Sequence, residues 1–161
     1  MPLVSDVERR IGLVSDTHGL VRPEALRFLA GSEAIVHAGD IGQPEVLNAL
    51  RAIAPLHAIR GNNDTDDWAK DLPDTLAIEL AGVKLFVLHD FNTTRRHPVP
   101  PGTQVVVCGH SHKPVIQEHP AGFLLVNPGS AGPRRFNLPV SAAQLRIGPG
   151  GRIDAKLVML L

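Results

Sequence analysis

The pattern of apolar and polar positions in the first part of the chain alternates between strand-length and helix-length segments. Short apolar runs predict strands, and two segments that open with proline in a helical first turn predict helices. In chain order we expect a strand at 11–15, a helix at 23–30, a strand at 34–37, a helix at 44–51 and a strand at 56–60. This alternation predicts βαβ units with parallel strand pairing.

The second part of the chain has many strand-like segments and few that are helix-like. Three pairs of apolar segments flank short turns that contain glycine, which is typical of hairpins, and a further apolar run predicts a single buried strand. The pairs are 75–80 with 83–89, 114–119 with 123–126, and 141–147 with 152–160, and the single strand is 104–108. We expect these strands to form a second, largely antiparallel or mixed sheet.

Composition places the chain among globular proteins. Its 161 residues predict one domain that covers residues 1–161, and a hydrophobic fraction of 43% with 20% charged residues suffices for a sizeable core. The formal net charge is +0, so the overall basic field that attracts nucleic acids is absent. We therefore expect no specific nucleic-acid-binding surface.

Cysteine usage and the N-terminal residues bear on the compartment. The single cysteine, Cys108, excludes an intrachain disulfide and favours a reducing compartment. Residues 1–10 lack the basic and apolar regions of a signal peptide, and the longest apolar runs are strand-sized. We expect a cytoplasmic protein without a membrane partner, and leave its oligomeric state open.

Residues with metal-binding side chains follow the predicted strands. The motifs are Asp16-Thr17-His18, Gly39-Asp40, Gly61-Asn62-Asn63-Asp64, His89 and Gly109-His110-Ser111-His112. Since ligand sites in open α/β sheets gather at the carboxyl ends of strands, we expect these motifs to converge. Their mixture of carboxylate, imidazole and amide without thiolate suits Mn, Fe, Zn, Co or Ni better than a structural zinc site.

The spacing within two of the motifs allows paired ligands. Residues at i and i+2 of an extended chain point the same way, so Asp16 with His18, and His110 with His112, can each supply two ligands to one cluster. A glycine precedes the ligand in three motifs, where it lets the backbone turn sharply or approach an ion closely.

In their order these motifs resemble the pattern of the calcineurin-like metallophosphoesterases: DxH, GDxx, GNxx, a histidine after a strand, and GHxH. The later Asn127-Pro128-Gly129-Ser130 is similar to the NPGS turn of the small bacterial and archaeal phosphodiesterases in that superfamily. The resemblance covers roughly residues 11–135. It implies an α/β fold, a four-layer α-β-β-α sandwich with two mixed β-sheets face to face.

The resemblance also implies two divalent metal ions, with Mn as the first choice, and a role for each ligand. The first ion would be held by Asp16, His18 and His112, the second by Asn62, His89 and His110, and Asp40 would bridge the two. Three of these residues are also expected to act in catalysis: Asp40, Asn62 and His110. The implied reaction is hydrolysis of a phosphate ester by a hydroxide that bridges the ions.

Two positions depart from the family pattern. The residue after the metal-binding Asn62 is often a histidine that contacts phosphate, whereas here it is Asn63, an amide that cannot act as an acid near neutral pH. This substitution favours phosphodiester over phosphomonoester substrates. Glycine commonly follows the strand-ending histidine, whereas here Asp90 follows His89. We prefer a loop carboxylate as its interpretation, ahead of a partner that orients an imidazole.

These observations predict a metal-dependent phosphoesterase whose partner is a small phosphate-ester substrate, with phosphodiesters preferred. Two alternatives stay open. One is a catalytically weak or inactive scaffold that binds proteins, as the retromer subunit of this fold does, and the other is a phosphomonoesterase. A P-loop nucleotide hydrolase is excluded because no GxxxxGK[ST] motif occurs.

The remaining polar side chains receive structural interpretations first. His37 is expected in the core or beside a ligand, His119 at an exposed hairpin turn, and Asp64 as a cap of the turn that follows it. Arg95-Arg96-His97 lies on a long basic loop, where the side chains are either solvated or face the substrate phosphate.

Overall fold

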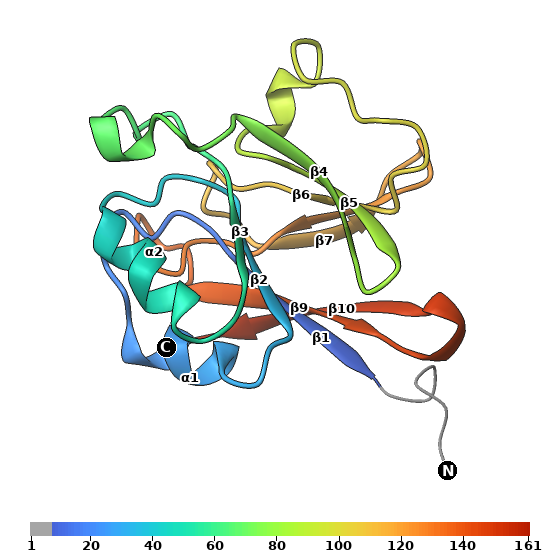
Figure 1. Cartoon of the computed structure of the whole chain (residues 1–161), viewed down its shortest axis with the longest axis horizontal. Coiled ribbons are helices and arrows are strands. Elements are labelled where there is room, and N and C mark those ends of the chain that lie inside the picture. Colours follow the sequence, from blue (N-terminus) through green and yellow to red (C-terminus); the bar gives the residue numbers. More distant parts are fainter. Residues whose placement is uncertain (1–7) are drawn as a thin grey trace.

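The computed structural model describes residues 8–161 and consists of two five-stranded β-sheets that lie face to face (Figure 1). Sheet A has the strand order β10-β9-β1-β2-β3, and sheet B has the order β4-β5-β6-β8-β7. The strands of sheet A are β1 (Arg9–Val14), β2 (Ala34–His37), β3 (Leu56–Ala58), β9 (Ser141–Ile147) and β10 (Ile153–Met159). Those of sheet B are β4 (Thr75–Leu80), β5 (Val83–Leu88), β6 (Val105–Val107), β7 (Val115–Glu118) and β8 (Leu124–Asn127). Each sheet contains parallel and antiparallel pairs, so the predicted α/β sandwich of two mixed sheets is confirmed.

The parallel part of sheet A follows the expected βαβ pattern. Strand β1 pairs with β2, and β2 with β3, through the crossover helices α1 (Pro23–Leu29) and α2 (Pro44–Arg51). Both helices begin at a proline, whose fixed φ suits a helical first turn. Gly12 in β1 faces α1, where a methyl group would collide with the side chain of Leu29. The absent side chain therefore lets α1 lie close to the sheet.

The last hairpin corrects the expectation that all later strands join the second sheet. Strands β9 and β10 pair with each other, and β9 pairs antiparallel with β1 on the free edge of sheet A. The inward side chains of β9, such as Ala143 and Leu145, are fully buried between the sheets, and those of β10 are partly buried. Hairpin patterning predicts the two strands but does not indicate which open edge they will join, because that choice depends on distant residues.

The main core lies between the sheets. Alternate residues of β1, β5, β6 and β9 point into it, among them Leu13, Val87 and Val107. Helices α1 and α2 cover the outer face of sheet A through a second apolar cluster that includes Leu29 and Leu47. The outer face of sheet B is covered by the chain after β5, which begins with the 3₁₀-helix η3 (Phe91–Thr93).

The remaining 3₁₀-helices are η2 (Asp67–Ala69) and η4 (Pro149–Gly151). Within residues 8–161, no helix has both the length and the apolarity to cross a membrane. Residues 1–7 lie outside the described range. The prediction that residues 1–10 contain no signal peptide falls mostly on these residues. Cys108 is buried, as expected of a packing residue, and burial raises the pKa of its thiol to about 12.

Candidate metal centre

The motif residues lie on loops at the carboxyl ends of five strands. Parallel strands β1, β2 and β3 end at one edge of sheet A, and parallel strands β5 and β6 end at the neighbouring edge of sheet B. The DTH, GD and GNND loops therefore come from one sheet, and His89 and the GHSH loop come from the other. The site lies where the two sheets meet, as the expectation for open α/β sheets requires.

The backbone of these loops is strained. Seven non-glycine residues in the described range have positive φ angles, and five of them are predicted ligands: Asp16, His18, Asp40, His110 and His112. The left-handed region is disfavoured for residues with a Cβ atom, and such strain concentrates at functional sites. The expectation of an extended chain through Asp16–His18 and His110–His112 is wrong. Left-handed turns, rather than strand-like alternation, aim these side chains.

The first group of ligand atoms comes from Asp16, His18 and His112, whose donor atoms lie within 4.8 Å of one another. Oδ1 of Asp16 is 3.7 Å from Nε2 of His18 and 3.5 Å from Nε2 of His112. The two imidazoles stack, with ring centroids 5.2 Å apart and Nε2 atoms 3.3 Å apart. This trio is the set that the sequence assigns to the first ion.

The other oxygen of Asp16 is bound by the protein. Oδ2 accepts a hydrogen bond of 2.7 Å from the hydroxyl of Ser15 and one of 3.1 Å from the backbone N–H of His110. Oδ1 is buried and makes no hydrogen bond to any described residue. The carboxylate is thus fixed in orientation, with one oxygen directed at the two histidines.

The second group is formed by Asp40, His89 and His110, again with donor atoms within 4.8 Å of one another. Oδ2 of Asp40 is 3.2 Å from Nε2 of His89, and it is also 3.7 Å from Nε2 of His18 in the first group. One carboxylate oxygen thus faces both groups, which is the position expected of a bridging ligand.

The hydrogen bond that His89 makes to Ala38 determines which of its ring nitrogens is free to bind a cation. Its Nδ1 lies 2.7 Å from the carbonyl oxygen of Ala38, so Nδ1–H donates to that oxygen. In the neutral imidazole, Nε2 then carries a lone pair. This lone pair faces the carboxylate oxygen of Asp40, and two acceptors at that distance repel unless a proton or a metal ion lies between them. The buried Nε2 has no hydrogen-bond donor among the described residues.

The pKa values of the carboxylates and histidines in the site are shifted by burial and by their neighbours. Burial raises the pKa of Asp16 and Asp40, but hydrogen bonds and charges from the histidines outweigh it and lower both, that of Asp40 to about 2. Burial lowers the pKa of His89, but its contact with Asp40 and the charge of Asp16 outweigh burial and raise it. For His112, burial prevails and the pKa falls. Both carboxylates are therefore ionised at neutral pH and can ligate a metal.

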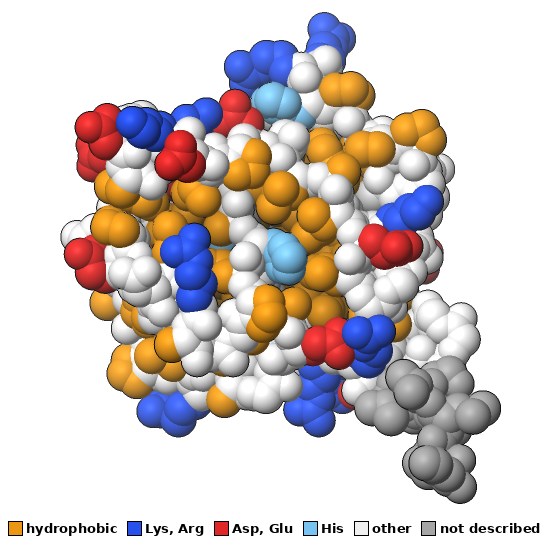
Figure 2. Space-filling model, viewed as in Figure 1, with side chains coloured by type: hydrophobic (Ala, Val, Ile, Leu, Met, Phe, Trp, Pro, Cys, Tyr) orange, Lys and Arg blue, Asp and Glu red, His pale blue; other side chains and the backbone are white. Residues whose placement is uncertain are grey.

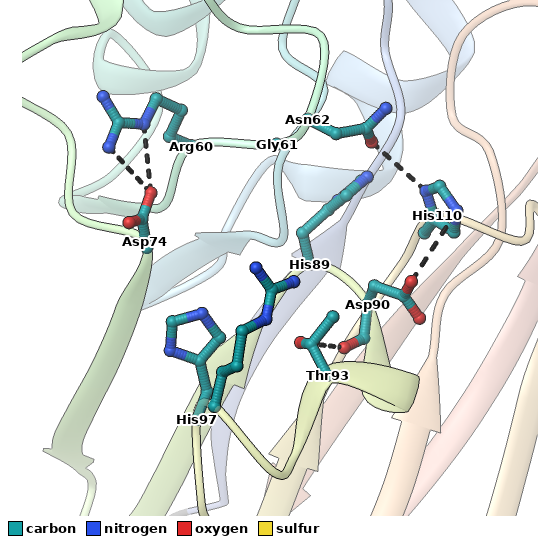
Figure 3. Close-up of a pocket in the computed structure, with 10 residues that line it drawn as sticks. Arg60, Gly61, Asn62, Asp74, His89, Asp90, Thr93, His97 and His110 are labelled. Atoms are coloured by element: carbon teal, nitrogen blue, oxygen red, sulfur yellow. Dashed lines mark hydrogen bonds and ion pairs between the residues drawn. The ribbon is translucent and has the colours of Figure 1, made fainter.

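Asn62, a predicted ligand of the second ion, lies next to His110. Its Oδ1 is 3.2 Å from Nδ1 of His110, and the side chain is exposed (Figure 3). On the other side of the same ring, Oδ2 of Asp90 is 3.8 Å from Nε2. A proton on Nε2, which Asp90 favours, leaves the Nδ1 lone pair facing the Asn62 oxygen. Asp90 also caps η3 by accepting a hydrogen bond from the backbone N–H of Asn92, so both interpretations of this residue have a contact to support them.

The prediction that Asp64 caps the turn after it is wrong. Asp64 does not cap the following turn, where Asp66 is the residue before η2. Its buried carboxylate instead accepts hydrogen bonds of 2.9–3.0 Å from the backbone N–H groups of Ile41, Gly42 and Gly61. Asp64 therefore ties the GD loop after β2 to the GNND loop after β3. The available signal in the sequence was a carboxylate at the end of the GNND motif.

The NPGS turn joins the two sheets at the site. Asn127 donates hydrogen bonds of 3.1 Å to the carbonyl oxygen of Gly109 and to Oγ of Ser111 in the GHSH loop. Ser130 donates 3.0 Å to the carbonyl oxygen of Asp16 in the DTH loop. The motif's resemblance to the NPGS turn did not by itself imply a function for these residues. Its contacts show that it holds the loops that carry ligands of the first group.

His37 and Gly61 fix the backbone of the loops that carry the predicted ligands. Nδ1 of the fully buried His37 accepts a hydrogen bond from the backbone N–H of Gly39, so Nε2–H donates to the hydroxyl of Thr17. A methyl group on Gly61 would overlap the backbone nitrogen and Oδ1 of Asp40. These contacts leave no room for larger residues beneath the ligands. His119, predicted to be exposed, is instead half-buried and stacks on a phenylalanine ring.

Comparisons with known families and proteins agree with this geometry. The model of the calcineurin-like phosphoesterase superfamily domain matches residues 10–149. A probable metallophosphoesterase of Methanothermobacter thermautotrophicus is 32% identical over 160 residues, which cover 92% of this chain and 91% of that protein. A second probable metallophosphoesterase, from Methanocaldococcus jannaschii, is 29% identical over 161 residues, covering 92% of this chain and 80% of the relative.

Solved structures share the fold at lower sequence identity. A structure described as a novel archaeal phosphodiesterase has a TM-score of 0.73 at 23% identity and covers 92% of this chain and 99% of its own. The phosphoesterase Yfce from E. coli has a TM-score of 0.67 at 22% identity, covering 94% and 100%. Vacuolar protein sorting 29 from Cryptosporidium parvum has a TM-score of 0.75 at 16% identity, covering 95% and 98%.

Proposed function

The chain belongs to the calcineurin-like phosphoesterase superfamily, and we propose that it hydrolyses phosphodiesters at a centre of two divalent metal ions. The observation that carries this proposal is that Asp40, a member of the second ligand group, also faces the first. Oδ2 of Asp40 lies 3.2 Å from His89 in one group and 3.7 Å from His18 in the other. Two cations bound so close together would need an anionic ligand between them, and we assign this role to Asp40.

We assign each ligand as the geometry allows. The first ion would be held by Asp16, His18 and His112, the second by Asn62, His89 and His110, and Asp40 would contact both. When bound, two such ions would polarise the phosphoryl oxygens and lower the pKa of a coordinated water. Mn is the metal we propose first, from the family resemblance. The protein residues orient the ligands: Ser15 holds Asp16, and Ala38 fixes the tautomer of His89.

The preference for diesters rests on Asn63 and on the neighbours of the site. Asn63 offers an amide where many relatives have a histidine, so this position supplies a hydrogen-bond donor but no proton for a poor leaving group. The similarity to a structure described as an archaeal phosphodiesterase supports the same preference. We propose a small phosphate ester as the substrate, which would reach the site from the side of Asn62 and His110, both of which are exposed.

The test measures hydrolysis of bis(p-nitrophenyl) phosphate and of p-nitrophenyl phosphate with added Mn. We expect the diester to react faster. Asp40→Ala should lower the rate by more than the roughly 10–100-fold typical of substitutions that only orient a metal ligand. Asp154→Ala, an exposed carboxylate on β10, is the matched control and should keep full activity.

Metal binding separates this proposal from the scaffold alternative. Calorimetric titration of metal-free protein with Mn should show two bound ions in the wild type and fewer in Asp40→Ala. A protein that binds no divalent metal, and that is inert toward both esters with Mn, Fe, Zn, Co and Ni, would instead be a scaffold of this fold.

A further inference from the structure

A cavity of about 270 Å³ opens beside the second ligand group. Two of its lining residues, His89 and His110, belong to that group, and Figure 3 shows them on one side of the cavity with His97 on the opposite side. Every residue of the lining is polar or glycine. Because no apolar side chain lines it, the cavity suits a charged, hydrophilic part of a substrate rather than a base ring or a lipid tail.

The wall opposite the ligands is a fixed turn. Asp90 caps η3 directly after His89, and the hydroxyl of Thr93 donates a 2.6 Å hydrogen bond to the carbonyl oxygen of Asp90. The backbone N–H groups of Arg96 and His97 both donate 3.0 Å hydrogen bonds to the carbonyl oxygen of Thr93. The turn thus presents Arg96 and His97 to the cavity while joined to a ligand of the second ion. In Figure 2, basic side chains gather on the segment that projects beyond β5 in Figure 1.

Of the two arginines that line the cavity, Arg96 is the one without a carboxylate partner among residues 8–161. Arg60 forms a two-pronged contact of 2.8 and 3.1 Å with one oxygen of Asp74, so these charges cancel. Asp90 is engaged by η3 and faces His110. Arg96, in contrast, makes no ion pair with any residue in the range 8–161. An anion from the substrate can satisfy it.

We propose that Arg96 and His97 form a subsite for a second phosphate group, so that the natural substrate is a phosphodiester that also carries a phosphate monoester. This inference rests on the proposed function and names its substrate class. The scissile diester bears one negative charge, which two divalent ions more than neutralise. The guanidinium fork of Arg96 matches instead the several oxygens of a terminal phosphate.

The first experiment compares two substrates with the same scissile bond, the dinucleotide TpT and its 5′-phosphorylated form pTpT. We expect the wild type to favour pTpT in kcat/KM by roughly 10–100-fold, the size of a charge-assisted contact. Arg96→Ala should remove this preference while leaving the rate on TpT within about two-fold. Arg95→Ala, an exposed arginine one position earlier that does not line the cavity, should retain it.

The phosphate could be carried by a nucleotide or by a sugar or polyol. A second arm therefore compares glycerophosphoinositol with glycerophosphoinositol 4-phosphate. An Arg96-dependent preference in either arm supports the subsite and identifies the carrier. No preference in either arm, or one that survives Arg96→Ala, overturns it, and an equal loss on TpT and pTpT would assign Arg96 to the scissile phosphate instead.

Binding to metal-free protein distinguishes failure of the subsite from failure of the hydrolase proposal. Calorimetry with thymidine 3′,5′-bisphosphate and thymidine 5′-monophosphate should show tighter binding of the bisphosphate to the wild type and to Arg95→Ala. Arg96→Ala and His97→Ala should each weaken it. If the protein hydrolyses no ester but shows this pattern, only the hydrolase proposal fails; if it hydrolyses diesters without this pattern, only the subsite fails.

Discussion

Asn63 binds both carboxylate oxygens of Asp40. Its backbone N–H donates a 2.9 Å hydrogen bond to Oδ1, and its side-chain amide donates 3.2 Å to Oδ2. Asn63, which stands where the family resemblance implies a phosphate-contacting histidine, therefore holds the proposed bridging ligand. The departure from the family pattern is not simply the loss of an acid, because the amide contributes to the position of Asp40.

The first prediction concerns the acid that Asn63 does not supply. Asn63→His introduces a group that can protonate a leaving alkoxide, and general acid catalysis of this kind typically contributes roughly 10²–10⁴-fold. We expect the ratio of monoester to diester hydrolysis to rise at least about ten-fold. Rates on alkyl phosphate monoesters, with Asn63→Ala as the control, provide the measurement. An unchanged ratio in Asn63→His would mean that this position does not determine substrate class.

The second prediction concerns the carboxylate that joins two ligand loops. Asp64→Ala leaves three backbone N–H groups without their acceptor, and each of the two buried ones, those of Ile41 and Gly61, costs about 1–3 kcal/mol. We expect a loss of roughly 3 kcal/mol or more in the free energy of unfolding of the metal-free protein, measured by urea titration. The control is Asp66→Ala, which removes an exposed carboxylate that makes no cap hydrogen bond and should change stability by less than about 0.5 kcal/mol.

The third prediction concerns the contact between Gly61 and Asp40. A methyl group at this position would overlap the backbone nitrogen and Oδ1 of Asp40, so the proposed bridging carboxylate must move. Gly61→Ala should destabilise the protein by about 1–3 kcal/mol and weaken Mn binding in a calorimetric titration. Gly148→Ala, where the nearest heavy atom is 4.0 Å away, should change neither quantity. Normal Mn affinity in Gly61→Ala would show that the bridge tolerates displacement.

The fourth prediction concerns acid stability. Burial lowers the pKa of His37 to about 4 from its ordinary 6.5, although nearby carboxylates oppose this shift. Between pH 6.5 and 4 the unfolded chain binds a proton that the folded protein does not, so stability falls by up to about 3 kcal/mol as the pH drops. His112, with a lowered pKa, adds to this loss, whereas Asp16 and Asp40 contribute only below pH 3.8.

The measurement is the free energy of urea unfolding of the metal-free protein between pH 4 and pH 7. The value of each variant is expressed relative to that of the same variant at pH 7. His37→Gln should flatten the loss between pH 6.5 and 4. Above pH 6.5 the trend reverses, because the raised pKa of His89 gives stability that is lost as the pH rises through it. Equal slopes for wild type and His37→Gln would assign the acid loss to other groups.

Local patterns predicted the elements well because each signal acts over a few residues. The prolines at 23 and 44 mark the first residue of both helices, and the turn at 81–82 connects two strands within one residue of their predicted bounds. The motif order also predicted which side chains gather at the site: two groups of three lie within 4.8 Å. Their identity as metal ligands stays a prediction that the experiments above address.

What the sequence could not predict depends on contacts across the fold. The edge that β9 joins is decided by its match to β1, more than a hundred residues away. The acceptor role of Asp64 requires the loops after β2 and β3 to lie side by side. The direction of Arg96 depends on a turn anchored to Asp90. In each case the local sequence permits several arrangements, and tertiary packing selects one.

The pairing of β9 with β1 has a consequence for the order of events during synthesis. Strand β1 emerges early from the ribosome, but its second neighbour in sheet A is complete only when Ile147 has been made. The hydrogen bond from Ser130 to Asp16 likewise waits for the later part of the chain. Such long-range pairing slows folding. The DTH loop therefore reaches its final form late, and we expect the proposed metal ions to bind after most of the chain has been translated rather than during translation.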